Sequence, residues 1–146
     1  PNEADWEKAA RGTDQRWFPC GNKNVSGKFL NLADRGTGYY YSYNLVDDGY
    51  RDTSPVGNYP AGASPYGAYD MAGNVLEWTA DWFSDSYYSV SLAENPTGPE
   101  SGMLKVLRGG SLNSGNWSIR STTRFYLGPE YAYSYIGFRC AASADR

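Results

Sequence analysis

Residues that form turns interrupt this chain at short intervals along nearly its whole length. Examples are Gly21-Asn22, Asp48-Gly49, Gly57-Asn58, Gly73-Asn74, Asn95-Pro96 and Gly109-Gly110. Gly and Asn allow positive φ, and Pro removes a backbone donor, so long helices and long strands are excluded. The 146 residues include 17 Gly, 14 Tyr and 5 Trp, a combination that favours short strands joined by loops. With no internal repeat or linker, the pattern predicts one loop-rich α+β domain over residues 1–146.

Only the first residues have strong helix signals. Acidic residues come soon after Pro1, as is typical of the first turn of a helix. The helix-compatible residues Ala4, Trp6, Ala9 and Ala10 are next, and Gly12 is a typical residue for the end of a helix. We expect short strands at residues 75–79, 105–108 and 136–141, and a short helix or turn at residues 81–87. After the second of these strands, Gly109-Gly110 is expected to turn the chain sharply.

Composition excludes several classes of function. The net charge is −3 and no basic block occurs, so nucleic acid is not an expected partner. No run of about 18 apolar residues is present, so membrane insertion is not expected. The absence of His excludes His-based triads and His-ligated zinc or iron.

Four sequence blocks carry a resemblance to a known family. They are residues 3–12 (EADWEKAARG), 69–78 (YDMAGNVLEW), 106–111 (VLRGGS) and 136–140 (IGFRC). In this order the blocks resemble the sulfatase-modifying-factor, or formylglycine-generating-enzyme, superfamily. The resemblance implies a C-type-lectin-like fold with short antiparallel strands and few helices. It also implies that residues 1–146 are the C-terminal portion of the family domain, without its N-terminal segment. The chain is then a fragment, a cleaved product or a shortened homologue, and a companion chain that supplies the N-terminal segment is a further alternative.

The resemblance further implies that one or two Ca²⁺ ions are bound. The first set of ligands comprises the side chains of Asp70 and Glu77 with the carbonyls of Gly73 and Val75. The second comprises the side chains of Asn31 and Asp48 with the carbonyls of Leu32 and Tyr50. Such oxygen ligands suit a hard cation. The alternative is that Asp48-Gly49 is only a turn and Glu77 only a solvated strand residue.

The copper chemistry of the family is not expected here. The resemblance implies a Cu(I)-binding cysteine pair just after the Gly-Gly-Ser motif, where this chain has Ser114 and either Ser118 or Ile119. Cu(I) prefers soft thiolates, which serine does not supply. We therefore expect neither bound copper nor formylglycine-generating activity. In an accessory role the chain would supply at most a wall beside the substrate, since it has no His to bind iron.

The segment from Leu112 to Tyr135 is the candidate ligand-binding face. Tyr and Trp among small polar residues are typical of recognition surfaces. The candidate contacts are Ser114, Asn116, Trp117, Arg120, Arg124, Tyr126, Tyr131, Tyr133 and Tyr135. The alternative is that these aromatics fill the core beneath loops. A second group, Tyr39, Tyr40, Tyr41 and Tyr43, alternates poorly, so some of its rings must be exposed or stacked on one another.

Three functions remain open. The chain is a binding module for a protein or glycan, an enzyme or accessory domain of the sulfatase-modifying type, or a structural subunit of an extracellular assembly. Cys20 and Cys140 either form a bridge or stay separate thiols. Calcium binding and surface recognition suit an extracellular or periplasmic location.

Overall fold

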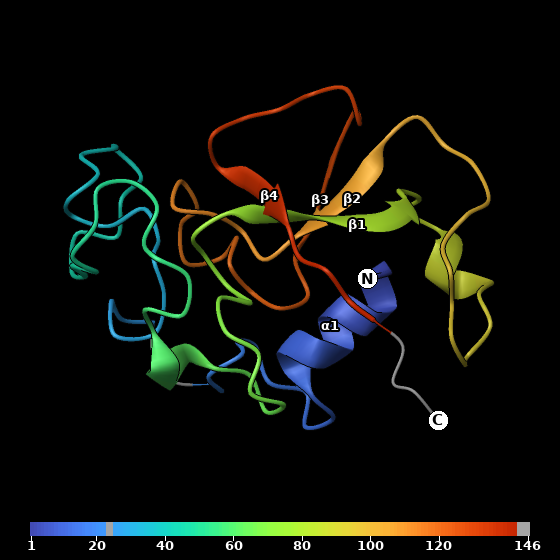
Figure 1. The fold of residues 1–146 in the computed structure, drawn as a ribbon, viewed down its shortest axis with the longest axis horizontal. Coiled ribbons are helices and arrows are strands. Elements are labelled where there is room, and N and C mark those ends of the chain that lie inside the picture. The colour runs from blue at the N-terminus through green and yellow to red at the C-terminus, as the bar shows by residue number, and fades with distance from the viewer. Residues whose placement is uncertain (23–24, 143–146) are drawn as a thin grey trace.

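The computed structural model describes residues 1–22 and 25–142, and loops make up most of them. The elements are α1 (Glu3–Arg11), η1 (Pro60–Gly62), β1 (Leu76–Trp82), η2 (Tyr87–Ser89), β2 (Lys105–Arg108), β3 (Arg124–Leu127) and β4 (Ile136–Phe138) (Figure 1). One helix, two single 3₁₀ turns and a small sheet confirm the predicted loop-rich α+β class in the described part of the chain.

Helix α1 forms where the sequence predicts it. The side chain of Asn2 accepts a hydrogen bond from the backbone N–H of Asp5 at 2.7 Å, which caps the first turn. Gly12, at φ 68°, ends the helix and donates its N–H to the carbonyl of Lys8. Both ends of the helix are therefore fixed by local sequence.

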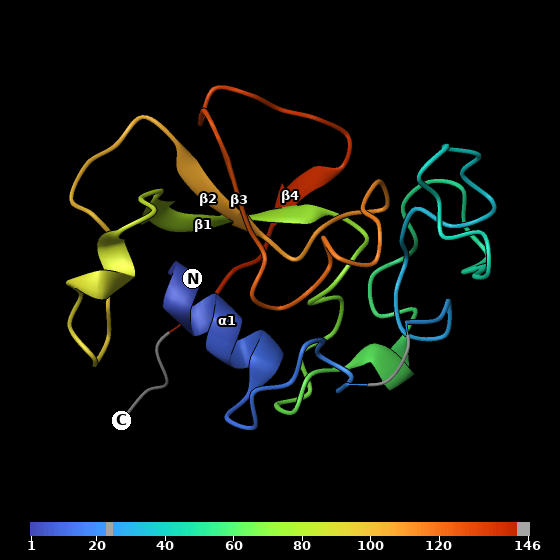
Figure 2. The same ribbon diagram turned by 180° about the vertical axis from the view of Figure 1, so that it is seen from behind.

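The sheet has the order β3-β2-β1-β4. Strands β1 and β2 pair antiparallel, as do β2 and β3, whereas β4 pairs with β1 in parallel. The expectation of antiparallel strands is thus wrong for β4. The chain leaves β3 at one edge and crosses to the other edge before entering β4, so β4 runs in the same direction as β1 (Figure 2).

Two predicted boundaries differ from the structure. Strand β1 continues to Trp82 through an irregular register, so residues 81–82 are strand and a 3₁₀ turn begins only at Tyr87. Asp81 stays in the strand because its carboxylate there accepts the N–H of Glu3 at the start of α1. Strand β4 ends at Phe138 rather than at residue 141, and β3 was not predicted.

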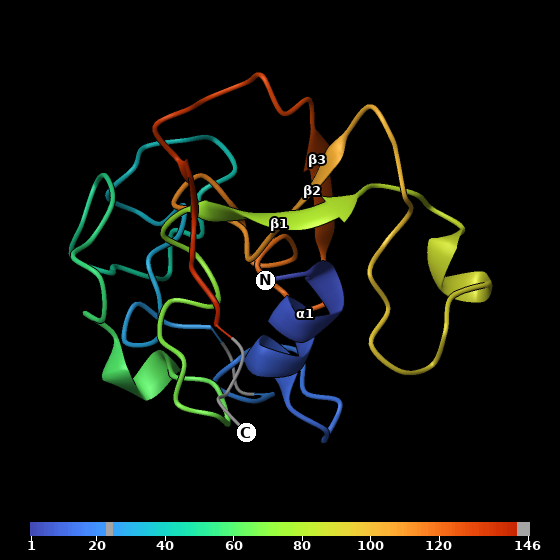
Figure 3. The ribbon, with the colours of Figure 1, turned by 45° about the vertical axis from the view of Figure 1, so that its right-hand side comes forward.

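The core consists of two apolar clusters on either side of the glycine turn after β2. Helix α1 lies beneath the sheet (Figure 3), and its residues Trp6 and Ala10 pack with Met71. The second cluster belongs mainly to the loops of residues 18–46, and Ile119 joins it from the segment after β2. Figure 1 shows these loops gathered at one end of the sheet, with the connection between β1 and β2 at the other.

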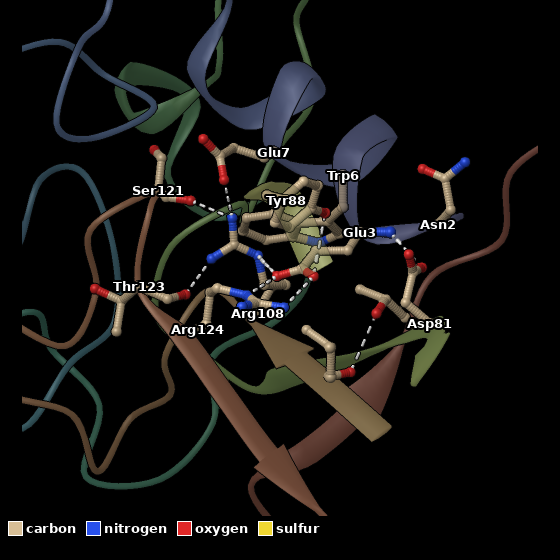
Figure 4. A network of polar contacts seen from close by, with 12 residues as sticks. Asn2, Glu3, Trp6, Glu7, Asp81, Tyr88, Arg108, Ser121, Thr123 and Arg124 are labelled. Atoms are coloured by element: carbon tan, nitrogen blue, oxygen red, sulfur yellow. Dashed lines mark hydrogen bonds and ion pairs between the residues drawn. The ribbon is translucent and has the colours of Figure 1, made fainter. Parts of the chain in front are cut away.

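Buried charges attach α1 to the sheet (Figure 4). The Arg108 side chain is fully buried and donates to Glu7 and to the carbonyls of Ser121 and Thr123. Arg124 contacts both carboxylate oxygens of Glu3, at 2.7 and 2.9 Å. The helix is thus joined to β2 and β3 by ion pairs as well as by Trp6.

The structure also bears on the two cysteines and on membrane insertion. Cys20 and Cys140 are not joined by a disulfide in the structure. Within residues 1–22 and 25–142, every helix is too short or too polar to cross a bilayer.

Candidate ligand-binding site

The candidate site begins at the turn that follows β2. Gly109 and Gly110 have φ of 94° and 70°, as the sequence predicts for a sharp change of direction. A Cβ on Gly110 would lie 2.8 Å from the side chain of Ile119, and one on Gly109 would lie 3.2 Å from the Trp6 ring. The two glycines therefore allow the chain to fold back over the core and to place residues 111–118 beside the loops.

A cavity of about 570 Å³ lies between this returning segment and the tyrosine-rich loop. Its lining residues are Tyr41, Ser42, Tyr43, Asn113, Ser114, Gly115, Asn116, Trp117, Ser118 and Phe125. All are aromatic, hydroxyl- or amide-bearing residues or glycine. The wall thus combines flat apolar rings with short hydrogen-bonding groups, and none of the described residues that line it has a charged or aliphatic side chain.

Backbone hydrogen bonds hold the two walls together. The N–H of Ala33 donates to the carbonyl of Ser114 at 3.1 Å, and the N–H of Tyr43 donates to the carbonyl of Ala33 at 2.7 Å. Ser114 also accepts the N–H of Ser111 on its hydroxyl, which closes a small turn. The tyrosine loop is therefore positioned by the same short segment that forms the opposite wall.

The residues at the copper positions of the family lie at this cavity. Ser114 and Ser118 both line it, whereas Ile119 is fully buried in the core. Of the two alignments open for the second position, Ser118 is the one that shares the cavity with Ser114. Two hydroxyls thus stand where the resemblance implies thiolates.

An arginine between two tryptophans lies at the edge of the cavity. The guanidinium carbon of Arg120 is 4.2 Å from the ring centroid of Trp117 and 4.6 Å from that of Trp17. Trp117 is 73% exposed and Trp17 is 53% exposed. Cation–π contact with both rings restricts the orientation of the guanidinium.

Beyond the cavity, three tyrosines form a stacked row. Tyr131 and Tyr133 are nearly parallel with centroids 6.4 Å apart, and Tyr133 and Tyr135 are nearly parallel at 5.3 Å. Tyr133 and Tyr135 line a groove of about 220 Å³ together with Tyr126. Burial chiefly, and then the nearby phenols of Tyr39, Tyr40 and Tyr135, raise the pKa of Tyr41.

The structure divides the predicted face into three parts. Ser114, Asn116 and Trp117 line the cavity with Arg120 at its edge, and the four tyrosines form the row and its groove. Arg124 is the first residue of β3, and its side chain instead pairs with Glu3 of α1. Asn113 and Phe125 lie in the predicted segment but are not among its predicted contacts. Tyr41, Ser42, Tyr43 and Trp17 lie outside the segment, although the Tyr-rich run at residues 39–43 was a visible signal.

At the first predicted calcium site, the guanidinium of Arg139 occupies the carboxylate of Glu77. Arg139 donates to both carboxylate oxygens of Glu77 at 2.6 Å and to the carbonyl of Asp70. Glu77 also accepts the indole N–H of Trp6, and the Asp70 carboxylate accepts the N–H of Gly57. Since the guanidinium already balances the Glu77 charge, these residues fit calcium poorly as they are arranged here.

In the part of the chain that the structure describes, the second predicted calcium site has an unpaired oxygen and an unbalanced carboxylate, both of which a bound cation would satisfy. The side-chain carbonyl oxygen of Asn31 is buried without a hydrogen-bond partner, and its amide donates to the carbonyl of Asp52. Asp48 accepts the N–H groups of Leu32 and Tyr50, and no ion pair balances its charge within the described residues. Burial raises the pKa of Asp48, as do the neighbouring charges of Asp34 and Asp47.

Calcium at either site would depend on amide and backbone oxygens. In the described ranges, no three His, Cys, Asp or Glu side chains cluster as a metal site. A mixed set of amide, carbonyl and carboxylate oxygens still suits calcium. By this chemistry the Asn31–Asp48 site fits the ion better than the Asp70–Glu77 site.

Known proteins share the sequence and the fold of this chain. The chain is 40% identical over 146 residues to the formylglycine-generating enzyme of Mus musculus, with 97% of the chain and 38% of the relative covered. It is 39% identical over 144 residues to the serine/threonine-protein kinase pkn1 of Chlamydia caviae, with 97% of the chain and 20% of the relative covered. The solved structure of PvdO from Pseudomonas aeruginosa superposes with a TM-score of 0.74 at 33% identity, covering 94% of this chain and 49% of that one.

The chain therefore spans between a fifth and two-fifths of the length of these two relatives. Proteins with different names carry this domain, so membership of the family fixes the fold rather than the activity. The family described as sulfatase-modifying factor enzyme 1-like domain matches residues 1–144. From this match and these identities, the chain belongs to the sulfatase-modifying-factor, or formylglycine-generating-enzyme, superfamily.

Proposed function

We propose that this chain is a ligand-recognition module of the superfamily and that it binds a protein or glycan through the cavity beside Trp117. The observation that carries the proposal is the cavity wall, which joins aromatic rings to serine and asparagine side chains. Rings of this kind give a large contact area at low entropy cost, and small polar residues adapt their hydrogen bonds. Serine at positions 114 and 118 gives a site for binding rather than for Cu(I) chemistry.

Gly115 offers a way to test the cavity without disturbing the fold. A Cβ built on Gly115 has only one neighbour, the carbonyl of Tyr41 at 3.9 Å, and Gly115 is not in the left-handed region. Gly115→Ala should therefore be neutral, whereas Gly115→Trp should fill the space between the walls. The change in stability of both variants should stay within about 0.5 kcal/mol, as for substitutions without clashes.

The measurement is an array of oligosaccharides and peptides probed with the wild-type chain and both variants. We expect ligands that bind the wild type and Gly115→Ala alike and that lose at least about tenfold in affinity with Gly115→Trp, the equivalent of about 1.4 kcal/mol. Equal thermal midpoints serve as the folding control. Ligands that bind all three chains equally would place recognition elsewhere on the molecule.

We also propose that calcium occupies the Asn31–Asp48 site. The unpartnered carbonyl oxygen of Asn31 and the uncompensated buried carboxylate of Asp48 support this site. Bound calcium would supply the positive charge that Asp48 lacks. The residues that hold it precede and follow the tyrosine loop, so the ion would tie together both ends of one cavity wall. A calcium ion bound for stability suits an extracellular or periplasmic location, which we propose for this chain.

The second candidate function is an accessory domain of a formylglycine-generating-type enzyme. It is favoured by the 40% identity to the mouse enzyme and by the shared cavity position of Ser114 and Ser118. In that role the chain would contribute a substrate-side wall, and the reacting groups would come from elsewhere. Copper-dependent oxidation of a cysteine peptide by this chain alone would contradict both recognition and this accessory role, because the chain would then itself be the catalyst.

A further inference from the structure

Arg120 is a cation without a carboxylate. It makes no ion pair or side-chain hydrogen bond with residues 1–22 and 25–142, and its Nε is buried with no partner. The other arginine of the Leu112–Tyr135 segment, Arg124, is paired with Glu3. A buried donor left without an acceptor costs about 1–3 kcal/mol, so the Arg120 side chain is poised to gain from an incoming acceptor.

Its neighbours fix how that acceptor would approach. The ring centroids of Trp17 and Trp117 both lie within 4.6 Å of the guanidinium carbon, which leaves the N–H groups that point away from the two rings for hydrogen bonds. A guanidinium edge presents donors that match the two oxygens of a carboxylate in one plane. The segment around Arg120 is itself fixed, because the N–H of Ser121 donates to the carbonyl of Trp17.

The adjoining cavity has hydrogen-bond acceptors that lack donors in the described chain, and the hydroxyl groups of a ligand would supply those donors. The side-chain carbonyl oxygens of Asn113 and Asn116 are buried and lack hydrogen-bond partners. Ser114 and Ser118 lie in the same wall, as do the rings of Tyr41 and Trp117. Amide oxygens without donors, beside exposed aromatic faces, suit a ligand that is rich in O–H donors and has flat apolar C–H surfaces.

We propose that the ligand of this site is a carboxylated oligosaccharide, one of whose uronic acid residues is bound by Arg120. The proposal rests on the proposed function, since it assigns a ligand class to the same cavity. The carboxylate lies at the edge of the Arg120 guanidinium, and neighbouring sugar hydroxyls donate to Asn113 and Asn116. An acidic peptide would satisfy Arg120 but would leave these amide oxygens without matching hydroxyl donors.

The test is calorimetric titration with four probes. These are tetragalacturonate, its methyl ester, a hyaluronan tetrasaccharide and a tetraglutamate peptide. We expect one or both acidic sugars to bind, and the methyl ester and the peptide to bind at least about tenfold more weakly, because a charge-assisted hydrogen bond is lost or the hydroxyls are missing. The variant Arg120→Gln should bind the acidic sugars about as weakly as the wild type binds the ester.

Two further variants keep the result interpretable. Lys8→Gln removes an exposed positive charge from α1 and should leave binding unchanged, which controls for net charge. Arg120→Lys keeps the charge but not the planar fork, and it should recover only part of the affinity. Thermal midpoints report whether each variant folds.

The outcomes separate this inference from the proposed function. If the ester binds as well as the acid and Arg120→Gln changes nothing, while Gly115→Trp abolishes binding, the recognition site stands and the carboxylate assignment falls. Binding of the peptide alone through Arg120 overturns the sugar class. Failure of both acidic sugars to bind the wild-type chain overturns the inference as a whole, whatever the array shows for other ligands.

Discussion

Arg108 shows how a single buried residue organises this domain. Its side chain lies between α1 and the sheet, and it joins Glu7 to the carbonyls of Ser121 and Thr123 (Figure 4). Burial lowers the pKa of Arg108, opposed by the charges of Glu7 and Glu3, and arginine stays protonated even so. The side chain therefore keeps a full charge in the interior, balanced by carboxylates of the helix.

Replacing Arg108 should be among the most damaging single changes. Arg108→Met leaves the buried carboxylate of Glu3 with Arg124 as its one ion-pair partner among the described residues and leaves two carbonyls without a donor, so we expect a loss of about 3–5 kcal/mol. Urea denaturation measures it. The control is Arg35→Met, since the Arg35–Asp47 pair is exposed and should contribute at most about 1 kcal/mol. Similar losses in both variants would contradict the importance of burial.

At the scale of elements, the start of α1 is fastened to β1 by a carboxylate. Asp81 accepts the N–H of Glu3 at 2.6 Å through one oxygen, while its other oxygen is buried without a partner. Burial is the main cause that raises the pKa of Asp81. The contact thus holds the helix on the sheet at the cost of keeping a charge in a poorly solvated place.

The stability of the chain should therefore respond to pH through Asp81. A raised folded-state pKa means that folding takes up a proton, so this residue's contribution falls as pH rises from the unfolded pKa through the folded one. Asp81→Asn removes that dependence and can still accept the Glu3 N–H. We expect the stability of the variant relative to the wild type to be greatest at pH 7 and to decrease toward pH 4, in urea titrations at several pH values. A constant difference would show that Asp81 does not titrate in this range.

The elements also show what sequence could and could not predict. Helix α1 and β2 follow from local signals, namely the capping Asn2, the stop at Gly12 and the glycines after Arg108. Strand β3 and the parallel pairing of β4 depend on which segments meet in space, which no local pattern specifies. The same limit applies to the site. Trp117 was predicted from composition, but the contact of its neighbour Arg120 with Trp17 joins residues about a hundred positions apart.

At the scale of the whole molecule, the loops and the segment that follows β2 share one apolar core. Ile119, which follows β2, is buried among Phe18, Leu30 and Leu32 of the loops, so neither half keeps its core alone. We therefore expect one cooperative transition, and an ion bound in the loops should stabilise the sheet as well.

Calcium provides the test. At a hundred times its dissociation constant, an ion bound only by the native state adds about 2.7 kcal/mol, which corresponds to a rise of about 5–10 °C in the thermal midpoint for a domain of this size. Far-ultraviolet and aromatic circular dichroism should shift together. Asp48→Asn should abolish the shift, whereas Glu77→Gln should keep it. A shift that is lost with Glu77→Gln and kept with Asp48→Asn would assign the ion to the other site, and no shift in the wild type would remove calcium from the proposal.

The hydrogen bond from Ala33 to Ser114 has a consequence for how such a domain changes over generations. It joins the two cavity walls through main-chain atoms, so it does not depend on which side chains stand beside it. Neighbouring positions such as Gly115, Asn116 and Trp117 are free to be exchanged while the walls keep their spacing. The chain is therefore suited to serve as a scaffold for libraries in which these positions are randomised and new specificities are selected on an unchanged frame.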